Sequence, residues 1–61
     1  MNIYEEAHSY IRSIKTTKDE EYKTILIKEA IGFMDSLRID KLLYVEMKAV
    51  RLLKAIIKGE M

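Results

Sequence analysis

The stretch LLYVEMKAVRLLKAII, residues 42–57, decides the fold of this 61-residue chain. It lacks proline and glycine, and most of its residues favour helix. At heptad spacing one apolar seam consists of Leu42, Val45, Ala49, Leu52 and Ile56. A second, parallel seam consists of Leu43, Glu46, Val50, Leu53 and Ile57, with Met47 at its edge. A helix that covers one neighbouring layer needs a single apolar stripe, so two seams predict packing on two sides.

Capping signals place two more helices before this stretch. Asn2 followed by Glu5 has the pattern of a capping box, which predicts a first helix over about residues 3–15. Thr17 followed by Glu20 repeats the pattern and predicts a second helix over about residues 18–37. Its main apolar stripe consists of Tyr22, Ile25, Leu26, Ala30, Phe33 and Leu37.

The third helix is expected over about residues 41–58. Asp40 is a suitable N-cap, and Gly59 suits the left-handed position that ends many helices. The connection before it is short, which makes the second and third helices antiparallel neighbours. We therefore expect one all-α domain over residues 1–61, in which a short N-terminal helix accompanies an antiparallel two-helix hairpin in a three-helix bundle-like protomer.

The size of the chain favours self-association. A domain of about 60 residues buries only about 60% of its unfolded surface and is marginally stable alone. The chain has no Cys and one His, which excludes disulfides and a multi-histidine metal site within one copy. We expect a homodimeric helical bundle; the alternative is a compact monomer in which the first helix covers the surplus apolar face. The expected interface consists of Ile27, Ile31, Met34, Leu43, Glu46, Met47, Val50, Leu53 and Ile57.

Glu46 interrupts the second seam with a carboxylate. An unpaired carboxylate in an apolar seam is costly, whereas a paired one can fix helix register and oligomeric state. One interpretation is a buried, register-setting acid. The other is a residue at the rim of the interface whose carboxylate reaches water.

The residues give little support for chemistry. Glu5 and His8 form an E-x-x-H pattern, which supplies ligands in di-iron bundles, but both lie well outside the apolar stripe of the expected first helix. The two glycines, Gly32 and Gly59, are isolated, so no phosphate-binding loop is present. We expect no catalytic residue, metal, cofactor or small-molecule substrate, and hence no enzyme.

Positive charge gathers on the third helix. Residues 37–61 hold six basic and three acidic residues, although the whole chain has a net charge of only +1. Four of the basic residues follow one helical arc and are called the basic stripe here: Lys48, Arg51, Lys54 and Lys58. A basic stripe can contact phosphates, or it can simply keep an apolar helix in solution.

The expected function is non-catalytic. No apolar run approaches the roughly 18 residues of a membrane span, and the acidic N-terminal residues do not form a signal peptide. We therefore expect a cytoplasmic protein without membrane contact that acts as a small regulator or adaptor through helix-mediated contact with a partner protein, as a homodimer. The alternative is a small nucleic-acid-binding protein that uses the basic stripe.

Overall fold

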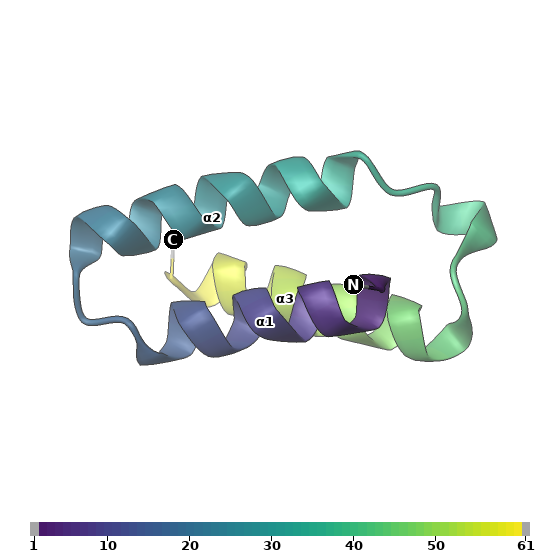
Figure 1. Cartoon of the computed structure of the whole chain (residues 1–61), viewed down its shortest axis with the longest axis horizontal. Coiled ribbons are helices and arrows are strands. Elements are labelled where there is room, and N and C mark those ends of the chain that lie inside the picture. The colour runs from purple at the N-terminus through teal and green to yellow at the C-terminus, as the bar shows by residue number, and fades with distance from the viewer. Residues whose placement is uncertain (1, 61) are drawn as a thin grey trace.

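The computed structural model describes residues 2–60, apart from the side chain of Ile39. Within those residues every regular element is helical, which confirms the all-α class (Figure 1). The elements are α1 (Ile3–Thr16), α2 (Glu20–Asp35), a short 3₁₀ helix η1 (Ile39–Lys41) and α3 (Tyr44–Glu60). The chain measures 34 × 21 × 17 Å along its principal axes, so its length is set by helices that lie side by side.

Side-chain caps fix where the first two helices begin. The Asn2 side chain accepts a hydrogen bond from the Glu5 N–H at 2.8 Å, as the capping pattern predicts. The second helix begins later than residue 18 because its cap is Asp19, not Thr17. The Asp19 carboxylate accepts from the Glu21 N–H at 3.0 Å and from the Tyr22 N–H at 3.3 Å. A carboxylate is well suited to this position because the exposed N–H groups give the helix end a partial positive charge.

The third helix begins at Tyr44, three residues after the expected Lys41. Asp40 lies in η1 instead of capping α3. Glu46, in the first turn of α3, reaches back, and its carboxylate accepts a hydrogen bond from the Leu43 N–H at 2.8 Å. The other end also differs from expectation, because α3 continues through Gly59, which has no positive φ.

The helices follow an up-down-up path. In Figure 1, α1 and α3 run in the same direction and α2 runs back between their ends. The close backbone contacts join α1 to α3 and, to a lesser extent, α1 to α2, whereas α2 and α3 do not form a comparably close pair. Helix α1 is therefore the shared neighbour, and a tightly packed hairpin of α2 and α3 is not confirmed.

The described residues form one apolar core between the three helices. Its buried residues are Ala7, Ile11, Ile14, Leu26, Ala30, Ala49, Leu53 and Ile57. Each helix contributes one alanine to this core, and small side chains let helix axes approach closely. At one end of the molecule, the Lys23 ammonium of α2 lies 3.2 Å from the Glu60 carboxylate of α3 and links these two helices.

A candidate protein-interaction furrow between α1 and α3

The two seams of α3 meet different environments. The second seam supplies most of the buried side of α3, since Val50, Leu53 and Ile57 all lie inside the chain. The first seam is only half covered: Ala49 is buried, but the side chains of Val45 and Leu52 are 52% and 47% exposed. The chain therefore satisfies one seam internally and leaves part of the other at its surface.

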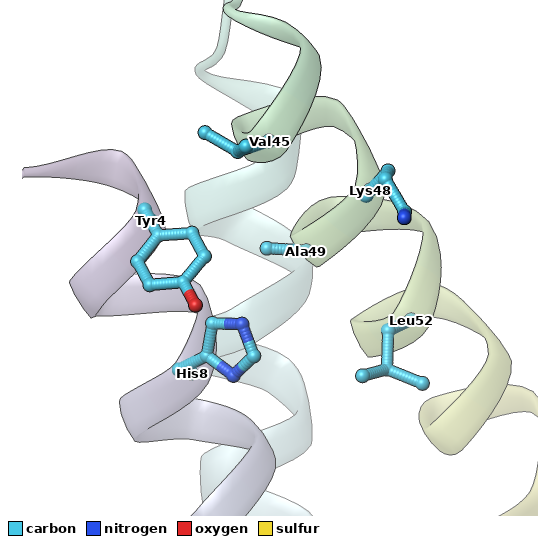
Figure 2. A pocket seen from close by; sticks show the side chains of 6 residues that line it. All are labelled: Tyr4, His8, Val45, Lys48, Ala49 and Leu52. Carbon is cyan, nitrogen blue, oxygen red and sulfur yellow. The ribbon is translucent and has the colours of Figure 1, made fainter.

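The exposed part of the first seam lines a hollow against α1, which we call the furrow. Its lining residues are Tyr4, His8, Val45, Lys48, Ala49 and Leu52. The hollow is open to solvent and has a volume of about 490 Å³. Figure 2 shows the Tyr4 and His8 rings on α1 facing the side chains of α3, with Val45 and Ala49 directed toward them. The furrow is thus mainly apolar, with polar atoms at its edges.

Two further hollows adjoin the furrow, one toward each end of α1. A neighbouring hollow shares Tyr4 and Val45 with it and includes Asn2, Leu43 and Glu46. Another shares His8 and passes to Arg12 and Lys15 near the end of α1. Because α1 rises about 1.5 Å per residue, the span from Tyr4 to Lys15 is roughly 16 Å, which is about three turns of a helix.

Two aromatic rings give the α1 wall of the furrow its shape. The Tyr4 and His8 ring centroids lie 4.5 Å apart, with 50° between the ring planes. These residues are one helical turn apart, so the contact needs no support from another helix. Tyr4 remains 44% exposed and offers a broad apolar face to anything that enters.

The nine residues of the expected dimer interface are divided by the structure. Val50, Leu53 and Ile57 are buried in the chain itself and are not available at its surface. Ile27, Met34, Glu46 and Met47 are partly buried, while Ile31 and Leu43 are exposed, Leu43 by 66%. The interface expected from the sequence does not include the furrow residues Tyr4, Val45 and Leu52. The signal was present, since Val45 and Leu52 belong to the first seam.

Glu46 has a role that neither interpretation included. Its side chain is partly buried, and the carboxylate holds the Leu43 N–H at the start of α3. Leu43 has no side-chain oxygen to cap the helix, so the acid three residues later supplies half of a capping box. This local role accounts for an acid in an otherwise apolar seam.

The basic stripe lies on the outside of α3. Lys48, Arg51, Lys54 and Lys58 are all exposed, and none forms an ion pair within the described residues. The Lys48 ammonium lies 5.5 Å from the centre of the Tyr44 ring, a cation–π arrangement at the surface. Lys48 also lines the furrow, so the stripe begins at the edge of the apolar surface.

The opposite side of α1 is closed by aromatic packing. The Tyr10 ring lies 5.5 Å from the Phe33 ring of α2, measured between centroids. Burial raises the pKa of the Tyr10 hydroxyl above its ordinary value of 10.0, and the charges of Glu29 and Glu6 raise this pKa further. The two faces of α1 therefore differ: α2 covers one, and the other borders the open furrow.

The described residues hold no group of three or more His, Asp or Glu side chains placed to bind a metal ion. Across residues 2–60, every helix is too short or too polar to cross a bilayer. Comparison of the chain with protein-family models, with curated proteins and with solved structures found no match.

Proposed function

We propose that this protein is a non-catalytic regulator or adaptor that acts through helix-mediated protein–protein contact and assembles as a homodimer. The observation that carries the proposal is the furrow, where Val45 and Leu52 stay about half exposed beside the Tyr4 ring. Neighbouring apolar side chains that line a groove between two helices are a common docking surface for an amphipathic helix.

Burial of the exposed furrow side chains by a partner would be favourable. Burying a Val or Leu side chain completely yields about 1.5–3 kcal/mol relative to leaving it exposed. With about half of Val45 and Leu52 still to bury, the furrow offers roughly 1 kcal/mol from each of them, and Tyr4 adds an aromatic face. Because association itself costs about 4 kcal/mol or more, these side chains would act as anchors within a larger interface.

The proposal is tested by capturing partners from the native host with cross-linking, using three baits. The baits are the unmodified protein, Leu52→Glu in the furrow, and Thr24→Glu as a matched control at an exposed position on α2. Circular dichroism first establishes that both variants are folded. We expect the captured set, including the protein itself, to be lost with Leu52→Glu and kept with Thr24→Glu. Equal capture by all three baits would refute the furrow as the contact surface.

Nucleic-acid binding is the second candidate, favoured by the four unpaired cations of the basic stripe among the described residues. Four phosphate contacts predict a loss of affinity of roughly 100-fold between about 50 and about 200 mM salt. The measurement is titration of random duplex DNA at both salt concentrations, with Arg51→Glu and Lys54→Glu as charge reversals. Absence of binding at the lower salt concentration would remove this candidate.

A further inference from the structure

The outer side of α2 carries an exposed patch that the core leaves unused. Glu21, Ile25 and Glu29 follow one another at i, i+4 spacing and therefore lie on one stripe, with Tyr22 beside it. The side chains of Tyr22 and Ile25 are 51% and 52% exposed, and both glutamates are exposed as well. We call these four residues the α2 ridge. It is an apolar pair with one acid before it and one after it along the stripe, and the exposed Lys28 lies beside Ile25 at i+3.

The furrow has the complementary character. Its floor is apolar, and cations gather toward the end of α1, where Arg12 and Lys15 line the adjoining hollow and Lys48 lines the furrow itself. All three cations are exposed, and none forms an ion pair within the described part of the chain. Acids occur at the opposite end, where Glu46 is engaged with the Leu43 N–H.

We propose that the α2 ridge of a second copy occupies the furrow, and that each copy gives its ridge to the furrow of the other. The inference rests on the proposed function and names its self-association surface. Ile25 and Tyr22 of one copy lie against Val45 and Leu52 of its partner, while the ridge glutamates face Arg12 and Lys48. Reciprocal exchange closes the pair with two-fold symmetry and leaves neither patch free.

A second copy fits this surface because the chain itself carries the matching patch. The match includes the apolar pair and the two ridge acids, which are opposite in sign to the furrow cations Arg12 and Lys48. The core within one chain is small: among the described residues, the large side chains that are fully buried are Ile14 and Leu53. A chain of this length gains more from covering a second apolar surface than a large domain does.

The first test is the mass in solution by multi-angle light scattering across a range of micromolar concentrations. We expect a dimer, twice the 7.2 kDa of one chain. Leu52→Glu in the furrow and Ile25→Glu in the ridge should each yield a monomer, while Thr24→Glu stays dimeric, with folding checked by circular dichroism. A monomeric unmodified protein, masses that rise beyond the dimer, or a dimer that survives both variants would each overturn the proposal.

A charge-exchange experiment tests the pairing of the two patches directly. Arg12→Glu with Lys48→Glu reverses the furrow, and Glu21→Lys with Glu29→Lys reverses the ridge. Each double variant alone places like charges together at both contacts, so we expect it to be monomeric at low salt. An equal mixture restores opposite charges at both contacts and should form a heterodimer. A mixture that stays monomeric, or either variant that dimerises alone, would contradict ridge-to-furrow pairing.

These outcomes separate the inference from the proposed function. If the protein is monomeric but Leu52→Glu still loses a captured host protein, the furrow binds another partner. The second-copy inference and the homodimer then fail, whereas the proposed helix-mediated contact with a partner protein stands. If Leu52→Glu changes neither mass nor capture, both fail.

Discussion

Adjacent leucines on α3 allow the division of the two seams to be tested with identical substitutions. Leu53 is fully buried, whereas Leu52 is 47% exposed. Replacing a fully buried leucine with alanine removes its burial and leaves a cavity, which together cost about 2.7–5 kcal/mol of unfolding free energy. A chain of this length has a total stability of roughly 3–9 kcal/mol. Leu53→Ala should therefore remove a large part of the unfolding free energy and shift the unfolding midpoint to much lower urea concentration.

The matched variant Leu52→Ala removes the same atoms from a half-covered position. Its expected cost is roughly 1 kcal/mol in the isolated chain, because about half of the deleted carbons are already in water. The assay is urea unfolding followed by far-UV circular dichroism, at a protein concentration low enough to keep the chain monomeric. Raising the concentration should increase the penalty for Leu52→Ala if association covers the furrow.

The comparison has a clear refuting result. If the two variants lose equal stability at low concentration, Leu52 and Leu53 are buried alike and the assignment of seams is wrong. If Leu53→Ala loses less than Leu52→Ala, the inward and outward seams are exchanged. Either result would remove the furrow as an exposed surface.

Two other predictions concern α2 and α1. A Cβ added at Gly32 meets nothing within 4 Å, so Gly32→Ala should raise stability by about 1 kcal/mol and the melting temperature by several degrees. Gly59→Ala, in the last turn of α3, should raise stability less. A loss of stability in Gly32→Ala would show that a close neighbour is present. Tyr10 has a pKa raised above 10.0 in the folded chain, so the unfolded chain ionises first as pH increases. The stability from neutral Tyr10 is complete below pH 10.0 and is lost as pH rises through the folded-state pKa. Tyr10→Phe should accordingly lose less stability than the unmodified protein between neutral and strongly alkaline pH, measured by urea unfolding; equal losses would contradict the raised pKa.

The helical class and the cap of the first helix could be predicted from the sequence, because hydrophobic periodicity and capping residues are local signals. Which seam of α3 faces the core could not be predicted, because both seams repeat at the same spacing. The choice depends on where α1 lies, and that is set by the path of the connections. The start of α3 was misplaced for a related reason: Asp40 is a strong N-cap residue, whereas Leu43 gives no capping signal until Glu46 is seen to reach its N–H.

The furrow was missed because it joins residues that are far apart in the sequence. Tyr4 and His8 belong to α1, and their counterparts Val45 and Leu52 lie on α3. The short connection between the second and third helices predicts that these two are neighbours. In the structure the closest backbone partner of α3 is α1, so the surface formed by that pair had no signature in either helix alone.

Because α1 and α3 run in the same direction, α2 does more than pack against them: it also connects one end of the molecule to the other. The chain leaves α1 at one end of the molecule and must return to the other before α3 can begin beside it (Figure 1). The length of α2 therefore sets how far α3 is shifted along α1. Deleting seven residues from α2 would shorten this helix by roughly 10 Å, or two turns, and would displace Val45 from Tyr4 across the furrow. Extra residues in the loop after Ser36 would leave the length of α2 unchanged. A deletion within α2 should therefore disturb the α1–α3 surface much more than an insertion in this loop.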